Sequence, residues 1–143
     1  MATEEAGQRI MEALSAPMPE RSIEEWVNDV GAGWQPLVRG LDANLRELDP
    51  DYRIGQIKEK FGGLRYYVDA FTGDTDEADR LVRAGEALSF KICEDCGAPG
   101  DTKAWNGFWV KTLCPYCVQL RQDEKEFKEM IERGDYEIES GDD

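Results

Sequence analysis

Four cysteines between Cys93 and Cys117 constrain the fold of this chain more than any other feature. They form two C-x-x-C pairs, Cys93/Cys96 and Cys114/Cys117, with seventeen residues between the pairs. Two such pairs, about fifteen to twenty residues apart, have the spacing of a tetrahedral site with four thiolate ligands. A site of this kind leaves no coordination position open, so its metal stabilises the fold and does no chemistry. We therefore predict a structural Zn²⁺ ion bound by these four side chains.

Other roles for the cysteines remain open at this point: two disulfides, a redox-active C-x-x-C pair, or free thiols. The Cys-Pro-Tyr-Cys half is also similar to the knuckles that bind iron in rubredoxins, so iron is an alternative to zinc. The sequence has no membrane-length apolar run and no signal peptide. We therefore expect a reducing, cytoplasmic location, where disulfides are rare and metal binding is favoured.

The chain contains no histidine among its 143 residues. Catalytic triads, Cys-His pairs and histidine-ligated hydrolytic metals are therefore excluded, and so is the usual proton shuttle at neutral pH. Any catalysis would depend on carboxylates, lysine or tyrosine. We expect that the protein is not an enzyme.

The net charge of −14 is distributed unevenly. Residues 122–143 carry ten acidic and three basic side chains, whereas residues 51–73 and 87–121 are each net +1. The overall charge argues against nonspecific attraction to nucleic acid or to anionic membranes. We interpret residues 134–143 as an acidic tail.

Periodic apolar residues predict helices over residues 4–14, 23–30, 34–48, 75–88 and 118–133. A capping box at Ser22 and Glu25 should begin the second helix, and Asp74 or Thr75 should cap the fourth. We predict an α+β fold, with helices packed on a β-hairpin or small antiparallel sheet and a four-cysteine zinc ribbon attached. The expected units are residues 1–90, a ribbon with its packed C-terminal helix over 91–133, and the tail.

Two β-rich runs, 52–61 and 64–70, predict a hairpin whose turn is formed by Gly62 and Gly63. In that register Lys60 faces Arg65 and Lys58 faces Tyr67. Like charges directly opposite each other are unfavourable. We therefore expect something negative to cover this basic face: the acidic segments of the chain itself, a partner protein or a phosphate.

A second hairpin is predicted around an Asn-Gly turn at residues 106–107. Its aromatic residues, Trp105, Phe108 and Trp109, are interpreted either as packing within the hairpin or as an exposed anchor for a partner.

Three segments carry a resemblance to a known family: the run Lys58–Tyr67, which reads KEKFGGLRYY, the two cysteine pairs, and the motif Gly33-Trp34-x-Pro36-Leu37. Together they resemble an uncharacterised family of small bacteriophage and prophage proteins, in which a KxKFGGLR[FY]Y segment precedes a four-cysteine zinc ribbon. The similarity covers about residues 31–118. It implies a phage-encoded zinc-ribbon protein and transfers no catalytic residue.

We therefore expect a non-enzymatic protein that binds a host protein in the bacterial cytoplasm and modulates it. The contact surface would be the face of Lys58, Lys60, Arg65 and Tyr67, the hairpin of Trp105, Phe108 and Trp109, or both. One alternative is nucleic-acid binding through the same basic face. Another is an acidic mimic of nucleic acid formed by residues 122–143. We expect no membrane partner.

Overall fold

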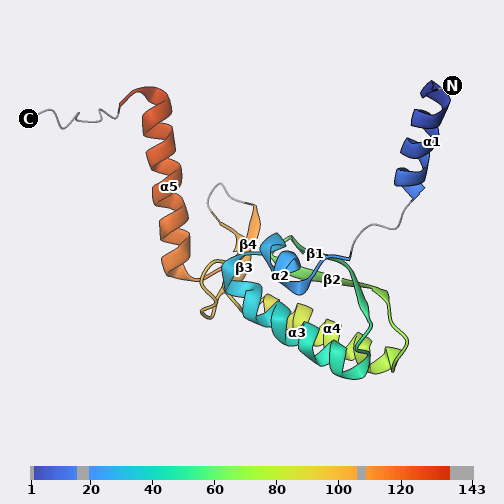
Figure 1. Ribbon diagram of the computed structural model, residues 1–143. Helices are drawn as coiled ribbons and strands as arrows, with labels where there is room; N and C mark the ends of the chain where they lie inside the picture. Colours follow the sequence, from blue (N-terminus) through green and yellow to red (C-terminus); the bar gives the residue numbers. More distant parts are fainter. Residues whose placement is uncertain (1, 16–19, 106–108, 136–143) are drawn as a thin grey trace, which may run out of the picture.

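The computed structural model describes residues 2–15, 20–105 and 109–135 and confirms an α+β protein (Figure 1). The described helices are α1 (Ala2–Ser15), α2 (Ile23–Trp26), α3 (Gln35–Leu48), α4 (Thr75–Ser89) and α5 (Pro115–Arg133), with short 3-10 turns at Val27–Asp29 and Ala32–Trp34. The described strands are β1 (Arg53–Lys60), β2 (Gly63–Ala70), β3 (Asp101–Ala104) and β4 (Val110–Leu113). They form two antiparallel pairs, β1–β2 and β3–β4.

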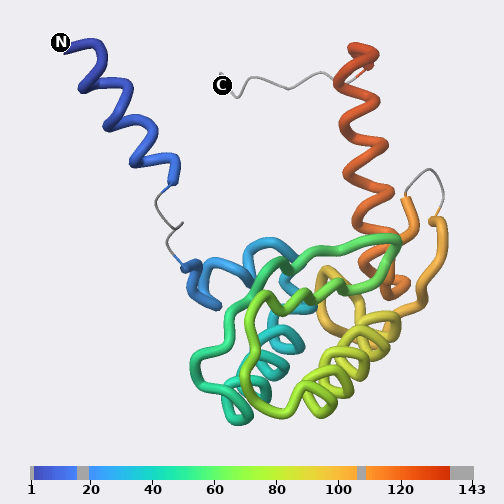
Figure 2. The backbone as a smooth tube through the Cα atoms, turned by 90° about the vertical axis from the view of Figure 1, so that its right-hand side faces the viewer, coloured from blue at the N-terminus to red at the C-terminus, as the bar shows by residue number. Residues whose placement is uncertain are grey.

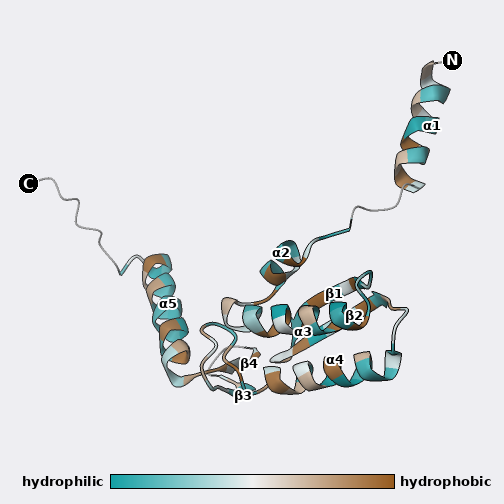
Figure 3. Cartoon of the chain, turned by 60° about the horizontal axis from the view of Figure 1, so that its bottom comes forward, coloured by the Kyte–Doolittle hydropathy of each residue, from teal (hydrophilic) through white to brown (hydrophobic). Residues whose placement is uncertain are grey.

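The main hydrophobic core lies between α3, α4 and the β1–β2 hairpin. Pro36 is accommodated in the first turn of α3, where its missing N–H leaves no hydrogen bond unmade. The core residues are Trp26, Val27, Val30, Trp34, Val38, Leu41, Leu45, Tyr52, Ile57, Leu64, Tyr66 and Ala78. Figure 3 shows hydrophobic residues in both helices and in both strands. The predicted apolar stripe of α3 therefore faces the core.

The β1–β2 hairpin is present, but its predicted register is wrong. The two-residue turn is Phe61 and Gly62, both with positive φ, so Lys60 pairs with Gly63 and Lys58 pairs with Arg65. From Ile57 to Lys60 each residue's partner is shifted by two, which leaves the two faces of the hairpin there unchanged. Gly63 cannot serve in the turn because it packs in β2 against the ring of Phe90, where a Cβ would overlap the ring.

A buried polar chain crosses the core between the hairpin and α3. The Tyr52 hydroxyl donates to Asp42 Oδ1 at 2.5 Å, so the Tyr66 hydroxyl must donate to the Tyr52 oxygen, also at 2.5 Å. Arg46 Nε approaches Asp42 Oδ1 to 3.1 Å, and its guanidinium lies over the Tyr52 ring. Every member of this chain finds a partner, as burial requires.

Some predicted local features differ in detail. The second predicted helix is a single α-helical turn that continues as a 3-10 turn. Ser22 is its N-cap but makes no side-chain bond to the backbone; its hydroxyl donates instead to Glu25 Oε1 at 3.4 Å. By contrast, Asp74 caps α4 by accepting from the Glu77 N–H at 3.1 Å. The first turn of α4 is therefore stabilised as predicted.

Helices α1 and α5 both extend away from the core (Figure 2). Their apolar side chains remain exposed, including Leu14 at 76% and Leu120 at 45%. Helix α5 ends at Arg133 and is capped by Gly134, which has a φ of +76°. No helix within the described ranges is long and apolar enough to span a membrane. The Asn106-Gly107 turn, Phe108 and tail residues 136–143 lie outside the described residues.

Candidate metal centre

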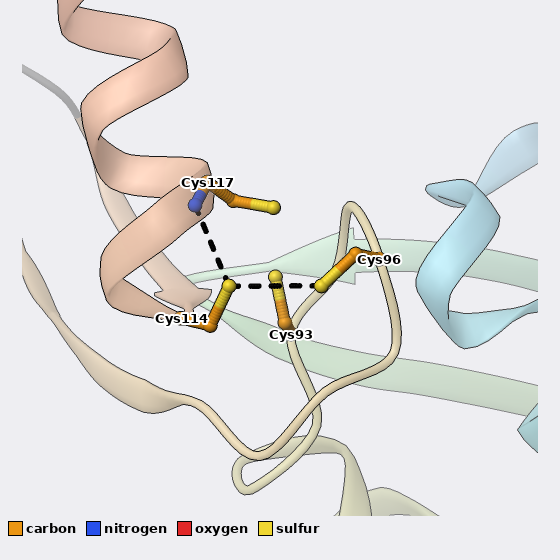
Figure 4. A group of neighbouring side chains, drawn as sticks. All are labelled: Cys93, Cys96, Cys114 and Cys117. Carbon is orange, nitrogen blue, oxygen red and sulfur yellow. Dashed lines mark hydrogen bonds between the residues drawn. The ribbon is translucent and has the colours of Figure 1, made fainter.

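The four cysteines come from two segments, the loop that follows α4 and the start of α5, and their side chains converge (Figure 4). Cys93 and Cys96 lie in the loop after α4, whereas Cys114 is the N-cap of α5 and Cys117 is in its first turn. All four Sγ atoms lie within 4.8 Å of one another, and none of the cysteines is in a disulfide. Cys96 alone of the four is exposed. The predicted residues are therefore brought together in one cluster.

The sulfur spacing fits a metal ion better than a covalent bond. Cys96 Sγ and Cys114 Sγ are 3.6 Å apart, whereas a disulfide requires about 2.05 Å. Four sulfurs placed tetrahedrally about 2.3 Å from an ion would be about 3.8 Å apart. The donor set is entirely sulfur, which suits a soft or borderline metal ion. The cluster can therefore hold a metal ion with protein ligands on every side.

Backbone N–H groups point at two of the sulfurs. Ala98 N–H donates to Cys96 Sγ at 3.5 Å, and Cys117 N–H donates to Cys114 Sγ at 3.4 Å. The Cys117 N–H is the main cause that lowers the pKa of the Cys114 thiol to about 7. Burial, in contrast, raises the pKa of the Cys117 thiol. The N-terminus of α5 therefore favours the thiolate form at Cys114, the form that binds metals.

The segment before α3 packs directly on the first cysteine pair. A Cβ at Gly33 would overlap the Cys93 carbonyl oxygen, and a Cβ at Gly31 would overlap the Glu94 carbonyl oxygen. Gly33 N–H donates to that Glu94 carbonyl at 2.8 Å. Only glycine allows the two backbones to approach this closely. This contact accounts physically for the glycine that precedes Trp34 in the sequence motif.

A buried carboxylate, which sequence reasoning missed, joins the cysteine loop to both hairpins. Glu94 Oε2 accepts from Thr112 N–H at 2.7 Å, and its other oxygen lies 3.7 Å from Lys111 Nζ. Lys111 Nζ is also 3.1 Å from Glu59 Oε2 on β1. Burial raises the pKa of Glu94, although the Thr112 N–H and Lys111 oppose that rise. A Glu inside a C-x-x-C pair gives no sequence signal for burial.

The turn of the first hairpin docks on the second hairpin. Thr112 Oγ1 donates to the Gly62 carbonyl at 2.6 Å, so the Thr102 hydroxyl, 2.5 Å from Thr112 Oγ1, must donate to Thr112. Thr102 Oγ1 also lies 2.8 Å from the Phe90 carbonyl oxygen. Gly62 lies close to Thr102, where a Cβ would come within 2.8 Å of its methyl carbon. The two hairpins are thus joined through Thr102 and Thr112.

The aromatic residues predicted for partner binding fall into two groups. Trp105 is partly buried beside the cysteine cluster, and its indole N–H donates to the Lys111 carbonyl at 3.0 Å. Trp109, in contrast, is 83% exposed. Packing therefore accounts for Trp105, whereas Trp109 remains available to a partner.

Trp109 lies on the same surface as the turn of the first hairpin. Together with Lys60 and Phe61 it lines an open hollow of about 350 Å³, completed by Glu59, Val110 and Lys111. Phe61 is 61% exposed, and the Lys60 Nζ is 5.6 Å from the centroid of its ring. The two surfaces predicted from sequence therefore meet at this hollow.

On the outer face of the hairpin, Lys58 and Arg65 lie directly opposite each other, and neither has a carboxylate within 4.0 Å among the residues the structure describes. Tyr67 is about half exposed, and the centroid of its ring lies 5.9 Å from Lys58 Nζ.

Comparison with family models, with curated proteins and with solved structures found no match.

Proposed function

We propose that the protein is a non-enzymatic binding protein whose cysteine cluster holds a structural Zn²⁺ ion. Zinc is favoured over iron because the doubled C-x-x-C spacing is typical of structural zinc sites and because zinc needs no redox partner. All four coordination positions would be filled by sulfur, so the ion would have no place for a substrate or for an activated water. Its role would be to fix the cysteine loop and the start of α5 against the core.

The partner would bind a surface that we call the aromatic–basic surface, defined by Lys58, Lys60, Phe61, Arg65, Tyr67 and Trp109. The observation that carries this proposal is the hollow shared by Lys60, Phe61 and Trp109. Exposed aromatic side chains beside cationic groups are typical of the residues that dominate binding energy at protein interfaces. With the resemblance to phage proteins, this supports a bacterial host protein as the partner.

Capture from bacterial lysate by the immobilised protein tests this function. We expect one defined protein to be retained by the wild type and lost with Trp109→Ala and with Lys60→Glu. Leu14→Ala and Arg80→Glu are matched controls, because both side chains are exposed and lie outside the surface. Equal capture by all variants would contradict the assignment. Robust hydrolase or nuclease turnover that Lys58→Ala abolishes would contradict the non-enzymatic role.

A second candidate function is binding of single-stranded nucleic acid. The specific observation in its favour is that Phe61 and Tyr67 each lie beside a lysine, with Nζ to ring-centroid distances of 5.6 and 5.9 Å. Bases stack on exposed aromatic rings while lysines neutralise the backbone. The net charge of −14 opposes long-range attraction of a polyanion, so we rank this function second. Gel shifts at low salt that detect no complex would eliminate it.

A further inference from the structure

We propose that Lys58 and Arg65 form a binding site for an oxyanion, either a phosphate or a carboxylate carried by the protein partner. This inference rests on the proposed function and names the chemical group that the outer face of the hairpin recognises.

The two cations are held together by the strand pairing. Lys58 on β1 is the direct cross-strand partner of Arg65 on β2, which places their Cβ atoms about 4.5–5.5 Å apart. Two like charges at this position destabilise a hairpin unless an anion lies between or above them. Lys60 follows two residues after Lys58 and lies on the same face.

Neither cation is neutralised within the part of the chain that the structure describes. Arg65 Nε is buried without a hydrogen-bond partner. The terminal nitrogens of Arg65 make no hydrogen bond either, yet they are not sealed from solvent. Packing thus holds the inner part of the guanidinium in place while its outer N–H groups stay unsatisfied.

The neighbouring carboxylates do not reach this pair. Glu59 points to the other face, where it binds Lys111 and accepts from the Gly62 N–H. Asp69 is on the same face as Arg65 but forms no ion pair with it. The local chain therefore leaves a cationic position uncompensated.

An oxyanion complements this arrangement better than a single-atom anion. The guanidinium presents parallel N–H groups that match two oxygens of a phosphate or carboxylate, and the ammonium of Lys58 adds a point charge. Because packing already restrains Arg65, ordering its side chain costs less on binding. The half-exposed Tyr67 next to Lys58 adds an aromatic contact at the rim.

Titration with inorganic phosphate, acetate and chloride at matched ionic strength tests the site in the intact protein. We expect phosphate to shift the NMR resonance of the Arg65 Nε–H in a saturable manner and chloride to leave it unchanged. Arg65→Gln or Lys58→Gln should weaken phosphate binding about tenfold or more, since each removes a charge-assisted hydrogen bond. Arg80→Gln is the control, because Arg80 is exposed and already paired with Glu77.

A thermal shift provides a second readout that does not depend on the folding of one variant. Phosphate should raise the melting temperature of the wild type, because a ligand that binds the folded state stabilises it. Without phosphate, Arg65→Gln should melt at or above the wild-type temperature, since it removes an unpaired charge. If chloride raised the melting temperature as much as phosphate does, the site would be wrong. The same conclusion would follow if phosphate raised the melting temperatures of Arg65→Gln and Lys58→Gln as much as that of the wild type.

The response to acetate identifies the source of the oxyanion. Binding of phosphate alone indicates a phosphorylated partner, and binding of both indicates an acidic one. If phosphate does not bind but Trp109→Ala still abolishes capture, the oxyanion site is wrong and the proposed function stands. If phosphate binds at Arg65 but no variant of the aromatic–basic surface affects capture, the proposed function is wrong. An oligothymidine that binds through Arg65 far more tightly than phosphate would overturn the protein partner.

Discussion

The indole N–H of Trp34 donates a hydrogen bond of 2.8 Å to the carbonyl of Ile92, the residue directly before Cys93. Trp34 is fully buried at the start of α3, so the cysteine loop is fastened to the centre of the core. The four cysteines therefore do not belong to an independent appendage. A disturbance at the cysteine cluster should be transmitted to the core, and the reverse should also hold.

The first prediction concerns metal content. Anaerobically purified protein should hold a single tightly bound Zn²⁺ ion per chain, measured by inductively coupled plasma mass spectrometry. Cys93→Ser should abolish tight binding and the cooperative unfolding transition, because a structural zinc ion contributes folding free energy directly. Tyr116→Ala, exposed between the two ligands of α5, should keep the ion. Wild-type protein without tightly bound metal would refute the zinc site.

The second prediction concerns the close approach at Gly33. Gly33→Ala should lower the free energy of unfolding by about 1–3 kcal/mol, the usual cost of overpacking, because its Cβ would overlap the Cys93 carbonyl. Gly40→Ala on α3 is the control. A Cβ at Gly40 would meet no atom within 4 Å, so this change should raise stability by about 0.5–1 kcal/mol. Urea denaturation measures both values, and equal effects would argue against the contact.

The third prediction concerns the interface between the two hairpins. Thr112→Val removes the hydroxyl that donates to the Gly62 carbonyl and contacts Thr102 Oγ1. Because the site is buried, we expect a loss of about 1–3 kcal/mol, measured by denaturant titration. Thr75→Val, at the first residue of α4 and exposed, is a control that should change stability less. A neutral Thr112→Val would show that the hairpins do not depend on this bond.

The fourth prediction concerns acid pH. The Thr72 N–H, with the Thr72 hydroxyl and the Asp51 N–H, lowers the pKa of Asp49 below its ordinary value of 3.8. The stabilisation is therefore complete above that value and is lost as pH falls through it toward the folded-state pKa. The difference in urea midpoint between wild type and Asp49→Asn should be largest near neutrality and shrink below about pH 4. A difference that stays constant across this pH range would contradict the assigned role of Asp49.

The fifth prediction concerns alkaline pH. Burial raises the pKa of Tyr52 and of Tyr66 well above the ordinary value of 10. Their contribution to stability is therefore present below pH 10 and is lost as the unfolded state begins to ionise above it. Absorbance titration at about 295 nm should show that these two tyrosines do not ionise until the protein unfolds. Ionisation of all tyrosines in the folded protein would contradict the buried network.

Local patterns in the sequence predicted much of this structure. The paired C-x-x-C spacing identified the residues of the cysteine cluster because a four-sulfur site requires two close pairs. The apolar stripe of α3 and the two antiparallel hairpins were also predicted, since periodicity and turn residues determine them. The α+β class followed from these elements.

Nonlocal contacts explain where sequence reasoning failed. The turn was predicted at Gly62 and Gly63. Because the ring of Phe90 packs on Gly63, the turn is instead formed one residue earlier, by Phe61 and Gly62. The burial of Glu94 depends on Thr112 and Lys111, which come from another hairpin. No local pattern encodes such pairings.

Helix α5 runs from Pro115 to Arg133, a span of nineteen residues, or about 28 Å at 1.5 Å per residue. Its N-terminal part is anchored by Cys114 and Cys117 of the cysteine cluster and by the ion pair between Arg121 and Asp95. The helix is thus a long rod that is held at one end by the cysteine cluster. A tilt of a few degrees at that end would therefore displace Arg133 far more than it displaces the cysteines.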